Sequence, residues 1–465
     1  MSAVDKQTRL QRGTNRLLFA GGFASLTALF IISLSYLLRF KSNLPIADEW
    51  GNFNPVRGLD HTLSLKWMFV TTNSHPMVIE RVIQWYFLRT TGYDFRMAAI
   101  LQLVFMFVVA LSMCLLMKKL SSGLPIVMAG LFTAAQGYNL FWPFEVLFFI
   151  QFFLIFWAAY FIAQENPRVI AAGYLISVIS IVQSGGGLAA APVFIVIGLL
   201  LGWRHNPSHR RLHFSGAVCV LAGLLAWVAF SNPDNPLVIA AAPWNLRFWT
   251  SLAELVSNGL GVTSSLGILF GRILLAALAV ALLYLAYATR LLKDSTFLTR
   301  FGVILAGTGL AIALSVSLTR ATGPGSGLNE RYHIIGYHLL VSIFFVALDL
   351  LDRFPFQQKI LEVCRILLVM TLGLTLTSKL GMARVYKALD ERQTLQLTCA
   401  QDFFRNPTST ACDGGPYGDE MQIRAVRHAR ELGATWCFEV MALPQVPKVV
   451  DECYAQLFER WSKEP

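Results

Sequence analysis

Apolar runs about as long as a membrane is thick recur along most of this chain. A helix that crosses a bilayer needs about 20 consecutive apolar residues, and about eleven segments reach or approach this length. They lie at 17–38, 97–117, 123–138, 145–164, 169–183, 187–203, 213–230, 264–289, 301–318, 333–350 and 361–379. The first run has no small-residue cleavage site, so we expect it to remain as a helix. The pattern predicts an all-α polytopic membrane protein with about eleven transmembrane helices.

The composition agrees with this prediction. Of the 465 residues, 55% are hydrophobic and only 14% are charged, whereas a soluble domain carries about 25% charged residues. The formal net charge is +11, which alone would be compatible with nucleic-acid binding. Basic residues in cytoplasmic loops explain this charge better, because Lys and Arg are enriched there in membrane proteins.

Lys and Arg are distributed unevenly among the predicted loops. If the N-terminus is cytoplasmic, most of them fall in inward loops, such as the basic run "RHNPSHRRLH". The outward turns "YNLFWPF" and "SGGG" have none, and the outward turn 231–263 has only Arg247. The positive-inside rule therefore predicts a cytoplasmic N-terminus, and an odd number of spans then predicts a periplasmic C-terminus. The expected location is the bacterial inner membrane.

Two outward regions are long enough to contain structure of their own. Residues 39–96 include "HTLSLKWMFV" and "HPMVIERVIQWYFL", where apolar residues recur at helical spacing beside Trp and Tyr. This pattern is typical of short helices that lie in the membrane interface. Residues 380–465 are polar and charged. We therefore expect a transmembrane domain at 1–379 and a small periplasmic tail at 380–465.

Four of the seven cysteines lie in this tail: Cys399, Cys412, Cys437 and Cys453. An even number of cysteines confined to one segment predicts two disulfides and an oxidising compartment. A zinc site is the weaker alternative, because the spacings include no CxxC pair. The sequence leaves the disulfide pairing open.

Polar side chains on the predicted outer side gather in the three motifs "ADEW", "NSHPMVIER" and "TRATGPGSGLNERY". Their candidate functional residues are Asp48, Glu49, Asn73, His75, Arg81, Arg320, Arg331 and Tyr332. A carboxylate can take a proton from an incoming hydroxyl, and Arg and His can hold a phosphate through charge-assisted hydrogen bonds. These parts suit the transfer of a sugar from a lipid phosphate to a hydroxyl group. Glu145, at the edge of a span, and Asn73 are further candidates for substrate contact.

The three motifs, with a large outward loop that opens on an acidic pair after the first span, resemble the GT-C superfamily of membrane glycosyltransferases. Within it they resemble an uncharacterised bacterial branch. The resemblance implies a polyprenyl-phosphate sugar as donor and inverting transfer to a hydroxyl of a surface or lipid-linked glycan on the periplasmic side. Pro76 and Glu330 depart from that branch, where Arg and Ser are the expected residues.

The resemblance also implies roles for individual residues. Asp48 would be the general base, and Glu49 would orient the acceptor or bind a metal. The donor phosphate would be held by His75, Arg81, Arg320 and Arg331, with Tyr332 as a buttress. Some GT-C enzymes need Mg²⁺ or Mn²⁺, and Asp48, Glu49 and the donor phosphate could supply oxygen ligands to such a cation.

Simpler explanations remain open for these residues. Asp48 and Glu49 can be a solvated helix end, His75 a satisfied interfacial histidine, and Arg81 a snorkelling cation whose charge reaches water. We expect His333 and His338 to be packing residues. The run "QSGGGLAAAP" predicts a tight turn between packed helices.

Two other classes of protein compete with a glycosyltransferase. A transporter or flippase of lipid-linked or amphipathic solutes would place ionisable residues near the membrane midplane and show repeat symmetry between its halves. A glycan polymerase or ligase would carry a large Arg-rich outward loop late in the chain. Here the ionisable residues gather at one predicted face and no repeat is visible, which favours the glycosyltransferase.

Overall fold

The computed structural model describes residues 3–40, 77–90, 95–118, 123–132, 146–204, 209–230, 239–262, 264–290, 292–329 and 332–353. Every element within these ranges is helical. The helices group into two compact units. The first unit contains α1 (Ala3–Phe40), α3 (Val78–Thr90), α4 (Phe95–Leu116), α5 (Leu124–Ala129) and the 3₁₀ helix η2 (Gly130–Phe132). The boundary expected near residue 379 lies outside the described residues.

The first unit is held together by close packing between α1, α4 and α5. A β-carbon on Gly22 of α1 would stand only 2.6 Å from a side-chain carbon of Ile126, so this glycine lets α1 and α5 approach. Phe30 and Phe107 stack with ring centroids 4.2 Å apart. Lys118, just after α4, lies 4.8 Å from the ring centroid of Phe19 near the start of the apolar part of α1. The two long helices are therefore antiparallel neighbours.

The second unit contains the helices from α7 onward. They are α7 (Val146–Ile162), α8 (Pro167–Ile181), α9 (Gly185–Arg204), α10 (Arg210–Phe230), α11 (Leu246–Gly259), α12 (Ser265–Ala288), α13 (Phe297–Arg320), η6 (Ser326–Leu328) and α14 (His333–Arg353). Four of them begin at a side chain that accepts a hydrogen bond from a first-turn N–H, as favoured helix caps do; these caps are Asn166, Asn245, Ser264 and Thr296.

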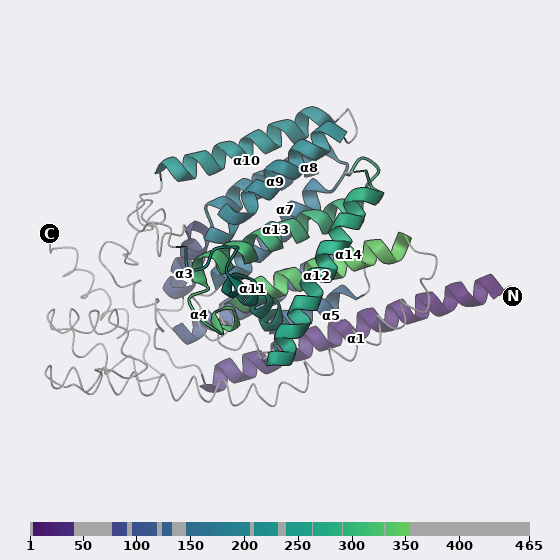
Figure 1. Ribbon diagram of the computed structural model, residues 1–465. Coiled ribbons are helices and arrows are strands. Elements are labelled where there is room, and N and C mark those ends of the chain that lie inside the picture. The colour runs from purple at the N-terminus through teal and green to yellow at the C-terminus, as the bar shows by residue number, and fades with distance from the viewer. Residues whose placement is uncertain are drawn as a thin grey trace, which may run out of the picture. The chain divides into compact units, whose positions relative to one another are not determined.

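Helices α8, α9, α10 and α13 run side by side in this unit (Figure 1). Tyr174 of α8 lies over Gly216 of α10, where a β-carbon would collide with its ring. Its hydroxyl lies 2.9 Å from Nδ1 of His213. Small residues at helix contacts are typical of membrane proteins, where van der Waals packing and interhelical hydrogen bonds drive helix association.

Aromatic rings join α7, α13 and α14. Phe156, Phe301 and Phe345 are fully buried, and the ring centroids of Phe301 and Phe345 lie 4.6 Å apart. The rings meet edge to face, which is a favourable arrangement for aromatic pairs. This contact helps to fix α13 against α14.

The expected membrane helices are confirmed in part. Seven of the described helices are long and apolar enough to cross a membrane: Leu18–Arg39, Arg96–Leu116, Gly185–Trp203, Arg210–Ala229, Ser265–Ala288, Phe297–Arg320 and His333–Leu350. The runs 145–164 and 169–183 form the apolar helices α7 and α8, which have 17 and 15 residues and are shorter than a usual span. Within 123–138 the described residues form only the short helices α5 and η2, and 361–379 lies outside the described ranges. The protein is a multi-pass membrane protein, and the regular structure of its described residues is entirely helical.

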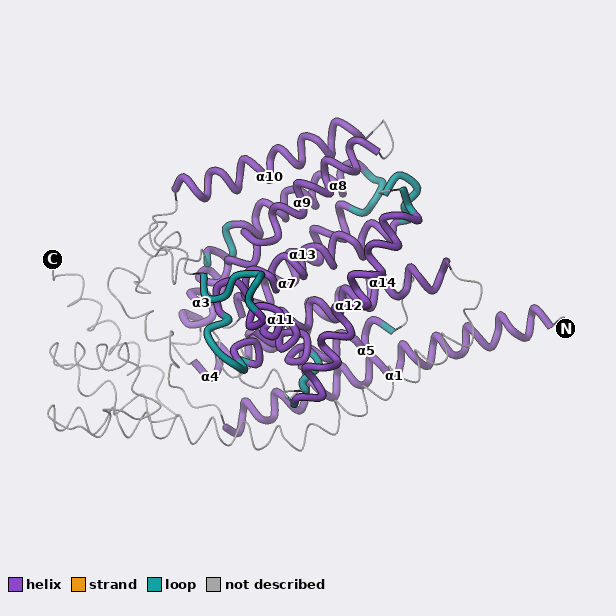
Figure 2. Tube along the Cα trace, viewed as in Figure 1, coloured by secondary structure: helices purple, strands orange, loops and turns teal. Residues whose placement is uncertain are grey.

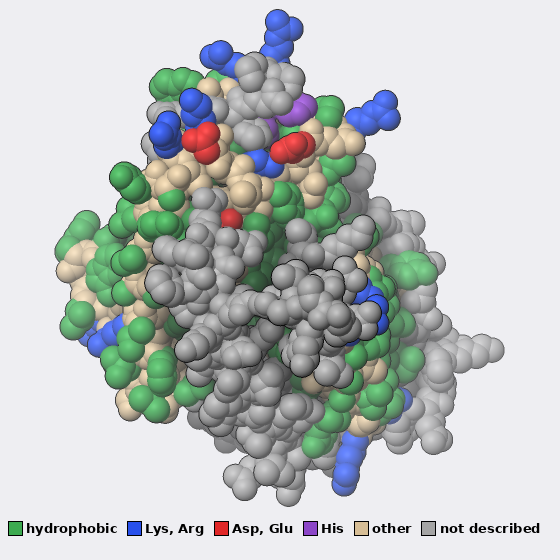
Figure 3. Space-filling model, turned by 90° about the vertical axis from the view of Figure 1, so that its right-hand side faces the viewer, with side chains coloured by type: hydrophobic (Ala, Val, Ile, Leu, Met, Phe, Trp, Pro, Cys, Tyr) green, Lys and Arg blue, Asp and Glu red, His purple; other side chains and the backbone are tan. Residues whose placement is uncertain are grey.

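The two ends of the second unit differ in the number of exposed Lys and Arg side chains. Exposed basic side chains gather where α8, α10 and α13 begin; they are Arg168, Arg210, Arg211, Arg290 and Lys293. Figure 3 looks toward this end, called here the basic end, and shows Lys and Arg side chains over it. Among the described residues near the other end, the basic side chains are Arg247, Arg272 and Arg320. Figure 2 shows the loops of the unit at these two ends, with a turn wrapped around α11.

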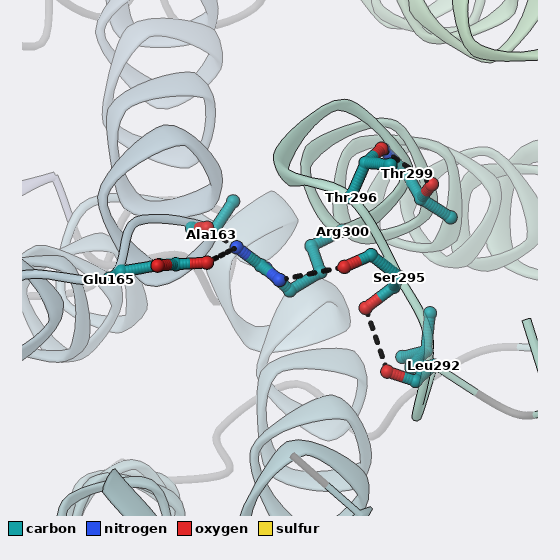
Figure 4. A network of polar contacts seen from close by, with 7 residues as sticks. All are labelled: Ala163, Glu165, Leu292, Ser295, Thr296, Thr299 and Arg300. Atoms are coloured by element: carbon teal, nitrogen blue, oxygen red, sulfur yellow. Dashed lines mark hydrogen bonds and ion pairs between the residues drawn. The ribbon is translucent and has the colours of Figure 1, made fainter. Parts of the chain in front are cut away.

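A network of polar contacts ties helices together at the basic end (Figure 4). The buried guanidinium of Arg300 donates Nε to the carbonyl of Ala163 at 3.0 Å and Nη1 to the carbonyl of Ser295 at 2.9 Å. Its Nη2 lies 3.3 Å from a carboxylate oxygen of Glu165. Because a buried charge is stable only when it is paired or hydrogen-bonded, these contacts account for Arg300 in the bundle.

A second contact at the basic end caps α13. The buried carboxylate of Asp349 in α14 accepts hydrogen bonds from the hydroxyls of Thr296 and Thr299 at 2.9 to 3.1 Å. Thr296 also accepts the backbone N–H of Thr299. The acidic group thus joins the C-terminal part of α14 to the first turn of α13, where negative charge is favourable.

Candidate functional site

The candidate site lies at the end of the second unit opposite the basic end, around helix α11. The segment 231–263, predicted to be an outward turn, contains this helix at residues 246–259. The sequence "LRFWTSLAELVSNG" places apolar residues at helical spacing after the cap Asn245, whose side chain accepts the N–H of Arg247. At 14 residues α11 is too short to cross a bilayer.

The start of α11 is exposed and apolar. Trp244 is 90% exposed and Leu246 is 76% exposed. Trp249 is also exposed, and its indole N–H donates to the carbonyl of Pro243 at 2.7 Å. Tryptophans are enriched at membrane interfaces. Most of the second half of α11 is buried in the unit.

The buried half of α11 holds the turn 321–329, which connects α13 with α14. The carboxylate of Glu254 is 3% exposed and accepts two backbone N–H groups of this turn. One oxygen lies 3.0 Å from the nitrogen of Gly325, and the other lies 3.0 Å from the nitrogen of Gly327. Hydrogen bonds to a charged group are about twice as strong as neutral ones, so Glu254 is the main polar anchor of the turn.

Asn258, one helical turn beyond Glu254, binds carbonyl groups of the same turn. Its side-chain nitrogen donates to the carbonyl of Gly327 at 3.2 Å and to that of Asn329 at 2.8 Å. Residues four positions apart lie on one helix face. That face therefore presents an acceptor pair at Glu254 and a donor at Asn258 to the complementary groups of the turn.

Glycines allow this close approach. A β-carbon on Gly327 would collide with the backbone oxygen of Ser251, and one on Gly336 would collide with the backbone oxygen of Leu255. Gly325 has φ of 78°, in the left-handed region that favours glycine. These three glycines in "GPGSGLNERYHIIG" are therefore required by the contact between the turn, α14 and α11.

Two predicted site residues flank this clamped turn. Arg320 is the last residue of α13 and is exposed, where its charge also complements the negative end of the helix dipole. Tyr332 is half-buried, and its backbone N–H donates to the carbonyl of Asn329 at 2.9 Å. The structure thus places Arg320 and Tyr332 at the two ends of the segment that Glu254 and Asn258 hold. Arg331 and Glu330 lie outside the described residues.

The histidines of α14 are buried, as expected for packing residues. His333 is 1% exposed and stacks on Tyr337 with ring centroids 6.3 Å apart, and the backbone of Asn258 lies beside it. His338 is 3% exposed and meets the ring of Phe152 edge to face at 5.5 Å. Neither ring is accessible to a substrate in this conformation.

Arg81 lies in the first unit, in the first turn of α3, and is 4% exposed. The neighbouring Glu80 is 1% exposed. A snorkelling cation would reach water, so the burial of Arg81 does not support that explanation. The helix α3 itself overlaps the predicted helical stretch "HPMVIERVIQWYFL" and extends two residues beyond it.

The remaining candidates lie outside the described residues. They are Asp48, Glu49, Asn73, His75, Glu145, Arg331 and the tail cysteines Cys399, Cys412, Cys437 and Cys453. The general base, the metal ligands and the disulfides of the tail therefore stay predictions. Of the described cysteines, Cys114 is buried and Cys219 is exposed on α10, and neither is in a disulfide.

The residue pattern does not predict a role for Glu254 and Asn258. The signal available was a pair of polar residues four positions apart in an amphipathic stretch. Their partners lie about 70 positions later in the chain, and nothing in the local pattern specifies that contact. The motif "TRATGPGSGLNERY" attracts attention through its cations, whereas its glycines allow the turn to pack closely against α11.

Within the described part of the chain, no group of three or more His, Cys, Asp or Glu side chains is arranged to hold a metal ion. No family model, curated protein or solved structure matches this chain. The fold and site define a multi-pass helical membrane protein with an exposed arginine beside a clamped turn at the end of its second unit opposite the basic end.

Proposed function

We propose that the protein is a GT-C-type glycosyltransferase of the bacterial inner membrane. It moves a sugar from a polyprenyl-phosphate donor to a hydroxyl of a surface or lipid-linked glycan on the periplasmic side. In this proposal the fold has about eleven transmembrane helices. Seven of them are the membrane-length helices of the described residues. The N-terminus is cytoplasmic, and the C-terminal tail is periplasmic with two disulfides.

The observation that carries the proposal is the setting of Arg320. Its guanidinium is exposed at the end of a membrane-length helix, away from the basic end of the unit. The adjoining turn is held by a buried carboxylate rather than left free. An arginine at the membrane surface on a fixed backbone can bind a lipid phosphate through two parallel hydrogen bonds.

The chemistry follows from the residue types. Asp48 takes the proton of the acceptor hydroxyl, and the oxygen attacks the anomeric carbon as the bond to the donor phosphate breaks. Arg320 and Arg331, with His75, neutralise the charge that develops on the phosphate. Glu49 orients the acceptor. A bound Mg²⁺ or Mn²⁺ would be held by Asp48, Glu49 and the donor phosphate and would supply positive charge beside that phosphate.

A transporter or flippase is the rival function. It would use ionisable groups near the membrane midplane. Among the described residues of the second unit, the buried charged groups lie near helix ends or in α11. Arg300 is in the first turn of α13, Asp349 is near the end of α14, and Glu254 is in a helix too short to span. The described buried charges of this unit therefore do not follow the midplane pattern of a transporter.

The test is an assay for release of polyprenyl phosphate from a panel of polyprenyl-phosphate sugars by the purified protein. With an active donor, Arg320→Ala should lower kcat/KM about 10- to 100-fold. This is the change expected when one or two hydrogen bonds to a charged group are lost. Arg320→Lys should retain part of the activity, because Lys keeps the charge without the planar fork.

Arg247 provides a matched control, since it is also an exposed arginine near the same end of the unit. Arg247→Ala should keep the parent rate. The proposal fails if no donor in the panel is turned over, or if Arg320→Ala transfers sugar as fast as the parent protein. Loss of activity in Asp48→Asn with an unchanged melting temperature would support its role as general base.

A further inference from the structure

The contacts between α11 and the turn 321–329 form a clamp with two complementary parts. Glu254 accepts the N–H groups of Gly325 and Gly327, one with each carboxylate oxygen. Asn258 donates to the carbonyls of Gly327 and Asn329. The two side chains thus bind both the donors and the acceptors of a backbone segment that lies between two long helices.

Apolar contacts fix α11 itself to the end of α13. Phe248 of α11 packs with Ala241 and Ala321, which are all at most 3% exposed, and Leu318 of α13 covers the cluster. The carbonyl of Leu318 also accepts the backbone N–H groups of Ala240 and Ala241 at 2.8 and 3.2 Å. The clamp is therefore mounted on the same helix that carries Arg320, so the position of the turn is defined relative to that arginine.

We propose that Glu254 and Asn258 are positioning residues for the donor phosphate. They hold the turn between Arg320 and Tyr332 in one conformation, so that Arg320 keeps the position in which it reaches the donor phosphate. This inference rests on the proposed function, because it assigns the clamp to the donor-binding step. The two side chains act only through the backbone of the turn, and neither has to contact the donor.

Glu254→Gln is the main test, because it keeps the size of the side chain and removes its charge. An amide presents one acceptor and one donor, so one of the two N–H groups of the turn loses its partner and faces an NH₂ group. Hydrogen exchange at the amide that loses its partner, Gly325 or Gly327, should become at least about 10-fold faster, as expected for a lost charge-assisted bond. The KM for the donor should rise about 10-fold, with kcat changed much less.

Asp349→Asn is the matched control. Asp349 is also a buried carboxylate with neutral hydrogen-bond donors, but it lies at the basic end of the same unit. This variant should lower the melting temperature and leave both the donor KM and the exchange at Gly325 unchanged. A merely structural role of Glu254 would likewise leave the donor KM unchanged. If the Gln variant does not fold, Asn258→Leu removes the other half of the clamp at similar volume and tests the same inference.

Unchanged exchange at Gly325 and Gly327 in the Glu254 variant would overturn the clamp. Faster exchange with an unchanged donor KM would overturn its role in donor positioning. If the parent protein releases no polyprenyl phosphate from any donor, the proposed function falls, and the donor-positioning role falls with it. The exchange measurement then decides only whether α11 clamps the turn.

Discussion

Gly325 sets the shape of the clamped turn through its backbone alone. Its φ of 78° is left-handed, and no atom lies within 4 Å of the position where a β-carbon would stand. Gly325→Ala should therefore destabilise the protein by about 1 kcal/mol, because an L-residue adopts this conformation only with steric strain. Thermal unfolding in detergent, followed by tryptophan fluorescence, measures the change.

Gly323 is the control for this prediction. A β-carbon on Gly323 would also stand in open space, but the φ of this residue is not in the left-handed region. Gly323→Ala should leave the melting temperature unchanged or slightly higher. Gly325→Asn should fall between the two, since Asn tolerates left-handed backbone better than Ala does. Equal melting temperatures for the two Ala variants would show that the left-handed turn does not contribute to stability.

At the residue scale, residue type and order single out candidate side chains, but they do not specify the contacts that hold those side chains. Arg320 and Tyr332 were singled out from residue type and order, and both flank one turn. Glu254 was missed because its contact depends on a segment about 70 positions away. His333 and His338 were expected to be packing residues, and their burial agrees with that interpretation.

At the element scale, the contact between α11 and α14 depends on two glycines that face each other. A β-carbon on Gly336 would collide with the backbone of Leu255 and lie 2.8 Å from the nitrogen of Gly259. Gly336→Ala should force the helices apart and destabilise the protein by about 1 to 3 kcal/mol, the usual range for overpacking. The melting temperature in detergent is again the measurement.

Gly21 in α1 offers the same substitution in a helix without the steric conflict, because nothing lies within 4 Å of its β-carbon position. Ala has a higher helix propensity than Gly, so Gly21→Ala should not lower the melting temperature. The close packing of α11 on α14 would be refuted if Gly336→Ala were as stable as Gly21→Ala.

Long apolar runs were the most predictable elements, because a run of about 20 apolar residues has few other stable conformations in a membrane protein. Short elements were less predictable. The run 123–138 was expected to be a span, but its described residues form α5 and a single 3₁₀ turn. Helix α11 was missed because 14 residues are too few to cross a membrane, and because its polar side chains Glu254, Ser257 and Asn258 are buried only by tertiary contacts.

At the scale of the whole molecule, the charge distribution relates the fold to the membrane. Exposed basic side chains gather at one end of the second unit, whereas α11 presents exposed Trp249, preceded by exposed Trp244, near the other end. Basic residues favour the cytoplasmic side, and tryptophans favour either interface. The position of the basic residues therefore determines the expected orientation, in which Arg320 lies on the periplasmic side.

Helix α13 allows a direct test of this orientation, because exposed turns adjoin both of its ends. It has 24 residues and a length of about 36 Å at 1.5 Å per residue, enough to cross the hydrocarbon core. Lys293 precedes the helix at the basic end, and Thr322 follows it beside the clamped turn; both are exposed. A membrane-impermeant maleimide should label Thr322→Cys in spheroplasts, but Lys293→Cys only after permeabilisation. The parent chain gives the background from native cysteines, and the reverse pattern would place Arg320 in the cytoplasm and reject periplasmic transfer.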